Sequence, residues 1–360
     1  MHHGKRLNGA RILITGHTGF TGSWMSLKLA AQGAEIHGFA LPPDTKPALF
    51  DLADVWPSLK SHTLGDIADF PLLLETVQRI APDAILHLAA QPLVIAGYAH
   101  PVRTFLTNTQ GTAHLLEAAR LTPSVRGVVA ITTDKVYAPT QDGQAFDENA
   151  PLGGKDPYSA SKSAAEFVID SYRHSLATWG RRLKIEVARG GNIFGGGDFA
   201  PNRIIPDFYR AVHNGSVLKL RKPDAKRPWQ HVLDLCGAYQ LLLERVLDGE
   251  DHSPGENWNI GPLEHESVSV IDLIGRFETY WQKIPLDVEP GPPETMVLAL
   301  NTTKARTKLG WHPRLTLDEA LHITADWYRT ALTKPGSLAE LTRQQIETHQ
   351  DSDRPKSTIA

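Results

Sequence analysis

Residues 12–22 read Ile12-Leu13-Ile14-Thr15-Gly16-His17-Thr18-Gly19-Phe20-Thr21-Gly22, and this stretch decides the fold. A short apolar run leads into three glycines spaced three residues apart, and a helical pattern follows. Glycine permits a tight turn, lets a pyrophosphate approach the backbone and allows close packing of helix on strand. Glycine triplets also serve purely structural turns. In this strand-turn-helix setting the stretch predicts a dinucleotide-binding turn, with phosphates at the helix N-terminus.

Outward from that turn, apolar runs alternate with helical patterns as far as about residue 187. The expected strands are 11–15, 35–40, 84–88, 127–132 and 184–188. The expected helices are 22–32, 70–80, 101–121 and 157–179. Such alternation predicts an α/β fold with a doubly wound, mostly parallel sheet of the Rossmann type. The strands are nearly all apolar, as burial on both faces requires.

After Ala188 the regular alternation of apolar runs and helical patterns ends, because glycines and prolines interrupt it. We expect residues 1–188 to form the dinucleotide-binding domain, with residues 231–261 returning to it. Residues 189–230 and 262–330 are expected to form a smaller C-terminal lobe that binds the substrate. Residues 331–360 are polar and without clear apolar periodicity, which predicts a weakly held helix followed by a loose tail.

The charge, cysteine content and hydropathy of the chain exclude several classes of protein. A net charge of −3 over 360 residues gives no excess of positive charge that would attract nucleic acid or an acidic membrane surface. Cys236 is the single cysteine, so a disulfide framework is excluded and a reducing, cytoplasmic location is expected. No apolar run approaches the roughly 20 residues that span a bilayer. The histidines are scattered without metal-ligand spacing, so no metal site is expected.

The second predicted strand lacks the acidic residue that usually closes it in dinucleotide-binding domains. The strand region reads Glu35-Ile36-His37-Gly38-Phe39-Ala40-Leu41, and the next acid is Asp44. No arginine lies there either, so a 2′-phosphate has no evident partner and NAD is preferred over NADP. Gly65-Asp66-Ile67 stands where a third strand between residues 40 and 70 should end, although no strand pattern is evident there, and Asp66 can accept a hydrogen bond from the adenine amino group. An aspartate in a surface turn is the alternative interpretation.

A tyrosine and a lysine four residues apart indicate where chemistry takes place. Tyr158 and Lys162 share one face of a predicted helix, one turn apart. An ammonium beside a phenol favours the phenolate, so we expect a lowered pKa for Tyr158. The phenolate can then take the proton of a substrate alcohol. Residues 159–162 also match the SxxK motif of acylases, but the chain has no SDN or KTG companion.

Further motifs accompany these two along the chain. They are His87-Leu88-Ala89-Ala90-Gln91, Asn108, Thr132-Thr133-Asp134-Lys135, Arg189-Gly190-Gly191-Asn192, Gly195-Gly196-Gly197-Asp198, Arg227-Pro228-Trp229-Gln230-His231-Val232 and Trp258-Asn259. Their order resembles that of extended short-chain dehydrogenases/reductases that act on nucleotide-sugars. Within that family the chain looks most like the 4,6-dehydratases, and among these the CDP-glucose 4,6-dehydratases. The resemblance covers about residues 9–330.

The chain departs from that family beside the expected sugar pocket. The family usually carries an aromatic-rich stretch after Tyr137, where residues 138–146 here read Ala-Pro-Thr-Gln-Asp-Gly-Gln-Ala-Phe. Val136 replaces the cysteine that normally stands between the lysine and the tyrosine. These differences leave the exact hexose and the exact reaction open.

The resemblance implies a lyase that carries out a 4,6-dehydration with NAD as cofactor. Oxidation of the hexose at C4 acidifies the C5 proton, and loss of that proton with the C6 hydroxyl gives an enone. Hydride return to C6 leaves a 4-keto-6-deoxy sugar. Tyr158 and Lys162 serve the oxidation, Thr133 completes the site, and Asp134 and Lys135 supply acid and base for the elimination. The alternative is that these last two are an incidental surface pair.

The resemblance also implies which residues bind NAD and which bind the nucleotide-sugar. Expected at NAD are Gly16, Thr18, Gly19, Phe20, Gly22, Asp66, Ile67, Leu88, Ala89, Ala90, Gln91, Asn108, Thr132, Tyr158, Lys162 and Arg189. Expected at the nucleotide-sugar are Gln91, Asn192, Asn202, Arg203, Arg221, Arg227 and His231. Arg227 suits the pyrophosphate, because its planar fork can hold two phosphate oxygens. Each weaker candidate can instead be a solvated surface residue.

The resemblance also implies an assembly and a metabolic role. Helices 101–121 and 157–179 are long enough to pair with a second copy, which predicts a homodimer or homotetramer through a helix bundle. The metabolic role implied is in deoxysugar and lipopolysaccharide biosynthesis.

Two other functions stay open. A nucleotide-sugar 4-epimerase or 4-reductase uses Tyr158 and Lys162 in the same way but does not need Asp134 and Lys135. A non-catalytic dinucleotide sensor has no use for Tyr158 and Lys162. The sequence does not decide the nucleotide, the hexose or the oligomer size.

Overall fold

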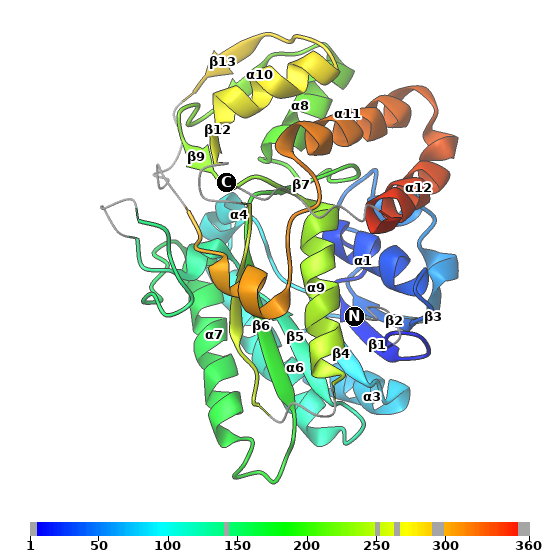
Figure 1. Cartoon of the computed structure of the whole chain (residues 1–360), viewed down its shortest axis with the longest axis vertical. Helices are drawn as coiled ribbons and strands as arrows, with labels where there is room; N and C mark the ends of the chain where they lie inside the picture. The colour runs from blue at the N-terminus through cyan, green and yellow to red at the C-terminus, as the bar shows by residue number, and fades with distance from the viewer. Residues whose placement is uncertain (1–5, 140–143, 249–252, 263–266, 290–298, 352–360) are drawn as a thin grey trace.

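The computed structural model describes residues 6–139, 144–248, 253–262, 267–289 and 299–351. A seven-stranded sheet forms its lower part in Figure 1, and helices with short strands form the upper lobe. The strands lie in the order β11-β6-β5-β4-β1-β2-β3, and every neighbouring pair is parallel. They are β1 (Arg11–Thr15), β2 (Glu35–Ala40), β3 (Leu59–Leu64), β4 (Ala84–His87), β5 (Gly127–Ile131), β6 (Lys184–Gly190) and β11 (Asn257–Ile260). The predicted α/β architecture is thus confirmed.

Helices cover both faces of the sheet (Figure 1). α1 (Phe20–Ala30) and α9 (Val232–Val246) lie on one face. α3 (Phe70–Ile80), α6 (Gly111–Leu121) and α7 (Pro157–Ser175) lie on the other. Two hydrophobic clusters fill the two interfaces. The sheet is therefore buried on both sides, which explains its apolar strands.

Residues of β1 show how one strand serves both clusters. Leu13 packs with α3, α6 and α7, whereas Ile12 and Ile14 pack with α1 and α9. All three are fully buried. Successive side chains of a strand point to opposite faces, so an unbroken apolar run is what a central strand needs here.

The helix predicted over 101–121 is interrupted. α5 (Pro101–Phe105) is followed by a π-helical turn over Leu106–Gln110 and then by α6. Within the turn, the buried Asn108 side chain accepts from the Gln91 backbone nitrogen at 2.8 Å and donates to the Gln91 carbonyl at 3.1 Å. Such turns in α-helices often occur at functional sites. Here the turn fixes the chain that follows β4.

The upper lobe packs around aromatic side chains. Phe199, Phe208, Tyr209, Trp281 and Tyr328 contact one another in a continuous cluster. Its main helices are α8 (Ile204–Asn214), α10 (Val270–Tyr280), α11 (Leu317–Thr333) and α12 (Leu338–Asp351). Its short strands are β7 (Ile193–Phe194), β8 (Leu218–Leu220), β9 (Lys226–Arg227), β10 (Gln230–His231), β12 (Val268–Ser269) and β13 (Leu286–Val288). Outside this lobe, two short helices accompany the helices of the sheet: α2 (Leu49–Leu52) contacts α1, and α4 (Val94–Ala99) contacts α5 and α7.

Residues 331–360 were predicted to form a weakly held helix followed by a loose tail, and the described part of this segment does contain a helix. α11 continues to Thr333, and residues 338–351 form α12, which packs on α11 and α1. Leu338 and Ile346 are buried in the core, and the His349 ring nitrogen lies 2.8 Å from an Asp234 carboxylate oxygen. The helix is thus present as predicted, but buried contacts hold it more firmly than its low apolar content indicated. Residues 352–360 lie outside the described part of the chain.

Within the described ranges, no helix is both long and apolar enough to cross a membrane. The same ranges contain no group of three or more side chains arranged to hold a metal ion. Cys236 is buried and free.

Three buried histidines make the fold sensitive to acid. Burial lowers the pKa of His87 and of His231 from 6.5 to about 3, and that of His17 to about 4. Below pH 6.5 the unfolded chain therefore binds protons that the folded chain does not. Stability falls as the pH drops from about 6.5 toward 4, by about 1.4 kcal/mol per pH unit for each histidine.

We expect the urea midpoint of unfolding to fall steeply between about pH 6.5 and 5. His87→Asn should reduce that slope by about one proton, although the variant loses contacts with Thr15 and Thr112. His174→Asn, on the exposed end of α7, is the matched control and should keep the slope. A midpoint that does not change with pH over this range would contradict the prediction.

Candidate active site

A cleft of about 1210 Å³ opens at the carboxyl ends of the strands, between the sheet and the upper lobe. The segments that follow β1, β2, β3, β4, β5 and β6 all contribute lining residues. Ligands of open parallel sheets bind at this edge. The cleft is therefore where both a cofactor and a substrate are expected.

The glycine-rich turn forms one wall of the cleft. Gly16 has a φ of +77°, and a Cβ there would lie 2.8 Å from the Ala89 backbone nitrogen. A Cβ on Gly22 would lie 2.1 Å from the Gly16 carbonyl oxygen. Gly19 begins α1 without a side-chain cap. The turn therefore needs glycine, and the start of α1 suits a phosphate group, which fits a dinucleotide.

The segments after β2 and β3 line the adjoining region. Leu41 and Asp44 follow β2 in the lining, where the sequence has no arginine. Asp66 and Ile67 follow β3. The Asp66 carboxylate accepts a hydrogen bond from the Ala68 backbone nitrogen at 2.9 Å, which orients it beside the cleft. This arrangement fits an adenine nucleotide without a 2′-phosphate.

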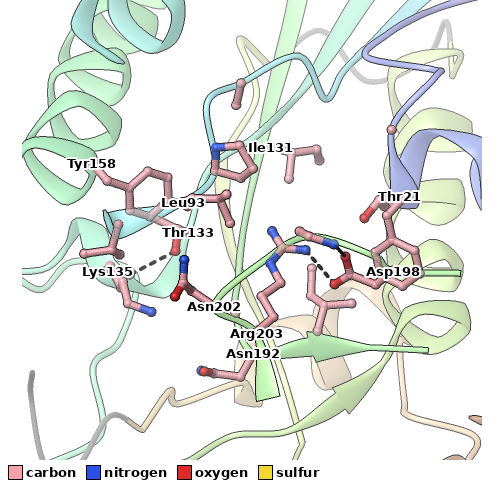
Figure 2. Close-up of a pocket in the computed structure, with 18 of the residues that line it drawn as sticks. Thr21, Leu93, Ile131, Thr133, Lys135, Tyr158, Asn192, Asp198, Asn202 and Arg203 are labelled. Atoms are coloured by element: carbon pink, nitrogen blue, oxygen red, sulfur yellow. Dashed lines mark hydrogen bonds and ion pairs between the residues drawn. The ribbon is translucent and has the colours of Figure 1, made fainter. Parts of the chain in front are cut away.

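The residues predicted to be catalytic meet in the cleft. Figure 2 shows Tyr158, Thr133 and Lys135 together on one side. Thr133 begins a 3-10 turn over Asp134–Val136 and accepts a hydrogen bond from the Lys135 backbone nitrogen at 3.3 Å. Tyr158 stands in the first turn of α7, which is capped by the carboxylate of Asp156. Two helix starts thus place the hydroxyls of Tyr158 and Thr133 side by side.

The predicted lowering of the Tyr158 pKa is wrong for the chain by itself. Burial raises the pKa of Tyr158 to about 12, and this outweighs the opposing effect of its hydrogen bond with Thr133. The Lys162 ammonium donates to the Ile131 carbonyl at 3.0 Å. Burial lowers the pKa of Lys162 to about 8, opposed by the charge of Glu166. Desolvation affects both groups more than they affect each other.

Asp134 occupies a closed niche next to Tyr158. Its side chain is fully buried and accepts hydrogen bonds from Thr133 Oγ1 at 2.9 Å and Asn192 Nδ2 at 3.2 Å. A Cβ on Gly191 would lie 2.2 Å from the carboxyl carbon, so the niche depends on that glycine. Among the described residues no ion pair joins Asp134 to Lys135. The two side chains are thus separately placed, as an acid–base pair requires.

The opposite wall of the cleft contains the charge of Asp198, which was not among the predicted site residues, beside the predicted Arg203. Asp198 is buried and forms an ion pair with Arg203 at 2.8 Å (Figure 2). Asn192 and Asn202 have φ values of +51° and +63°, which non-glycine residues rarely adopt. Backbones held in this way cluster at functional sites. Asp198 belongs to the quoted Gly195–Asp198 motif, which was the available signal.

Most predicted binding residues line the cleft, and their roles remain predictions. On the cofactor list these are Gly16, Thr18, Gly19, Phe20, Gly22, Asp66, Ile67, Leu88, Ala89, Ala90, Thr132, Tyr158 and Lys162. On the substrate list they are Asn192, Asn202, Arg203, Arg221 and Arg227. The lining does not include Gln91, Asn108, Arg189 or His231.

Arg189, predicted at the cofactor, is buried behind the cleft and is not among its lining residues. Its side chain is 2% exposed and forms an ion pair with Glu166 of α7. It also donates to the Tyr137 hydroxyl at 2.9 Å. Thr132 joins the same network by donating to Glu166 at 2.7 Å. The resemblance placed Arg189 at the cofactor, but in the structure a buried carboxylate takes up its charge.

The other three side chains lie behind the cleft wall. Gln91 donates to Thr104 at 2.9 Å and accepts from the Leu93 backbone nitrogen at 2.6 Å. Asn108 is engaged by Gln91 in the π-helical turn described above. His231 begins α9, accepts from the Leu233 backbone nitrogen at 3.2 Å and packs on Trp24. Their side chains thus bond to protein groups outside the lining, and their contacts with a ligand stay predictions.

The unusual segment at 138–146 contributes directly to the cleft. Pro139 and Phe146 line it, and Phe146 stacks on Tyr137 with ring centroids 4.8 Å apart. Residues 140–143 lie outside the described part of the chain. The sequence difference from the resembled family therefore reaches the site itself.

Sequence comparisons point to one family. A family model for GDP-mannose 4,6 dehydratase matches residues 13–324. The CDP-glucose 4,6-dehydratase of Salmonella typhimurium is 39% identical over 89% of this chain and 91% of its own length. A dTDP-glucose 4,6-dehydratase of Xanthomonas campestris is 27% identical over 89% of this chain and 93% of its own length.

Solved structures agree with the sequence matches. The dTDP-glucose 4,6-dehydratase DesIV of Streptomyces venezuelae, solved with NAD and TYD bound, is similar with a TM-score of 0.75 and 26% identity. The match covers 90% of this chain and 99% of that one. The UDP-glucose 4-epimerase of Thermus thermophilus in complex with NAD has a TM-score of 0.76 and 25% identity, covering 89% and 99%.

Proposed function

This chain belongs to the nucleotide-sugar 4,6-dehydratase family of the extended short-chain dehydrogenases/reductases, and we propose that it converts CDP-glucose to the 4-keto-6-deoxy sugar with NAD as cofactor. The observation that carries the choice of CDP-glucose is the 39% identity to the Salmonella CDP-glucose enzyme over nearly the whole of both chains. The Pro139 and Phe146 lining makes other hexoses the alternative to test.

Three features of the cleft support NAD as the cofactor. The glycine turn leaves no room for a Cβ, α1 begins without a side-chain cap, and Asp66 lies beside the cleft after β3. Gly16, Gly19 and Gly22 would hold the diphosphate, and Asp66 the adenine. NAD bound there would supply the hydride acceptor for the hexose C4 and the hydride donor for C6.

The side chains of the site divide the proton transfers between them. Tyr158 takes the proton of the C4 hydroxyl, helped by the hydrogen bond with Thr133 that opposes its raised pKa. Lys135 removes the C5 proton, and Asp134 delivers a proton to the departing C6 hydroxyl. Asp134 keeps its place through Thr133 and Asn192. Enclosure of both groups in the cleft keeps water from competing for these protons.

A direct assay tests the proposal. The protein is incubated with NAD and, separately, with CDP-glucose, UDP-glucose, dTDP-glucose and GDP-mannose, and products are analysed by mass spectrometry. We expect loss of one water from CDP-glucose, at a rate well above that with the other nucleotides. Turnover without a mass change would instead indicate a 4-epimerase, the activity of a structurally similar Thermus enzyme. Absence of turnover with every sugar would favour a binding module.

Arg227 provides a prediction about the nucleotide end of the substrate. It lines the cleft from β9 and is 7% exposed. We expect Arg227→Ala to weaken CDP-glucose binding by about 2–3 kcal/mol, because a charge-assisted bidentate contact to the diphosphate is lost. NAD binding should change little. Calorimetry on both ligands measures this, and equal weakening of the two would mean that Arg227 only supports the structure.

Lys222→Ala is the matched control for the Arg227 variant. Lys222 lines the same part of the cleft but was not among the predicted substrate residues. Its removal should weaken CDP-glucose binding much less than removal of Arg227, because a lysine cannot hold two phosphate oxygens in a fork.

The exposed side of α5, α6 and α7 supports the proposed assembly. Val102 is 82% and Phe167 61% exposed, and Phe105, Leu121 and Trp179 are also exposed. Apolar side chains in such numbers on one helical layer are typical of an interface. We propose a homodimer or homotetramer, which light scattering in solution tests. A cytoplasmic location and a role in deoxysugar and lipopolysaccharide biosynthesis belong to the same proposal.

A further inference from the structure

The Asp66 carboxylate is held from two sides. Its Oδ1 accepts from the Ala68 backbone nitrogen at 2.9 Å, and its Oδ2 forms an ion pair with Arg103 of α5. Each carboxylate oxygen can accept two hydrogen bonds, so both retain capacity on the cleft side. Burial raises the pKa of Asp66, but the two contacts and the charge of Arg103 outweigh it, so the net pKa is lowered. Asp66 is thus an oriented, ionised acceptor.

Arg103 reaches Asp66 from outside the cleft. Asp66 and Ile67 line the cleft, whereas Arg103 does not. The Arg103 side chain is 46% exposed, and it belongs to α5, far from Asp66 in the sequence. Without Arg103, only the Ala68 contact would resist rotation of the Asp66 side chain. With it, both carboxylate oxygens have fixed directions.

We propose that Arg103 is the positioning residue for recognition of the adenine amino group. This inference rests on the proposed NAD site and deepens it, because it names which contact of the dinucleotide depends on α5. Arg103 acts through Asp66: it fixes the carboxylate so that a free lone pair faces the amino group of the base. The chemical feature recognised is that exocyclic N–H donor.

A comparison of two dinucleotides tests the proposal. NAD carries the amino group, whereas nicotinamide hypoxanthine dinucleotide carries a carbonyl oxygen at that position, which accepts instead of donating, and its base N–H lies at the adjacent N1. Dissociation constants for both are measured by calorimetry on protein freed of bound nucleotide. The parent should prefer NAD by about tenfold, as expected for one charge-assisted hydrogen bond. Arg103→Met should bind NAD more weakly, and its preference should fall to within about twofold.

Two further variants complete the design. Arg103→Lys keeps the charge but not the fork, and it should recover part of the preference. Arg120→Met removes another arginine from an ion pair, that with Glu117 on α6, and should keep the full preference. Loss of assembly or a general loss of order would weaken both dinucleotides alike, so neither effect imitates the expected result.

The possible outcomes separate the two proposals. An Arg103→Met protein that keeps the parent preference for NAD overturns the positioning role, whether or not its affinity falls. A parent protein without any preference overturns it as well, because Asp66 then does not recognise the amino group. Failure of the parent to bind either dinucleotide would overturn the proposed cofactor itself.

Discussion

Tyr158→Phe should lose C4 oxidation by about 10²- to 10⁴-fold while the protein still folds and binds NAD. The ring keeps its place in the first turn of α7, where the Tyr158 backbone nitrogen donates to the Asp156 carboxylate at 3.0 Å. Only the hydroxyl is lost, and with it the group that takes the proton of the substrate alcohol.

The measurement is the appearance of NADH in a single turnover with CDP-glucose, alongside NAD affinity from calorimetry. Tyr172→Phe is the matched control, because Tyr172 stands on the same helix and its hydroxyl contacts Glu117 at 3.2 Å, away from the cleft. That variant should oxidise at the parent rate. Near-normal oxidation by Tyr158→Phe would show that another group accepts the proton and that the assignment is wrong.

The sheet could be predicted because its signals are local. The strands at 11–15 and 35–40 and the helix at 70–80 have the predicted bounds. The helix over 70–80 carries its own start signals: the Asp69 side chain accepts from the Leu72 backbone nitrogen, and a proline stands in the first turn. Alternation of such segments is enough to specify a doubly wound sheet.

The errors concern groups whose partners lie far away in sequence. Arg189 was expected at the cofactor, yet its partner is Glu166, on another element. A weakly held helix was expected after residue 331, yet α12 is anchored by His349, which contacts Asp234 in the interior. No local pattern reveals that a charge will be buried against a distant opposite charge. Tyr158 and Lys162 are both buried. Desolvation therefore raises the pKa of Tyr158, although the lysine one turn away had suggested a lowered pKa.

Asp134→Asn combined with Lys135→Met should separate oxidation from dehydration. Neither change should disturb the fold. Asparagine has the shape of aspartate: in the niche that Gly191 leaves open, its Oδ1 can accept from Asn192 and its Nδ2 can donate to the Thr133 hydroxyl. Methionine preserves the length of the half-buried lysine stem. The fold and Tyr158 are thus kept, while the acid and the base of the elimination are removed.

The double variant should therefore still oxidise C4 and then stop. We expect NADH, or a 4-keto sugar that retains its C6 hydroxyl, to accumulate. The 4-keto-6-deoxy product should form at less than about one hundredth of the parent rate, the usual contribution of a lost general acid or base. Deuterium from the solvent should not enter C5, because the residue that exchanges this proton is absent. Mass spectrometry of the sugar measures both results.

The same variant also distinguishes the two enzymatic activities. An epimerase needs only removal and return of hydride at C4, so its turnover should be largely insensitive to the loss of Asp134 and Lys135. A dehydratase cannot lose the C6 hydroxyl without them. Single variants then assign the roles: Lys135→Met alone should block deuterium entry at C5, whereas Asp134→Asn alone should permit that exchange but slow the loss of water. Unimpaired loss of water by the double variant would show that other side chains of the cleft carry out the elimination.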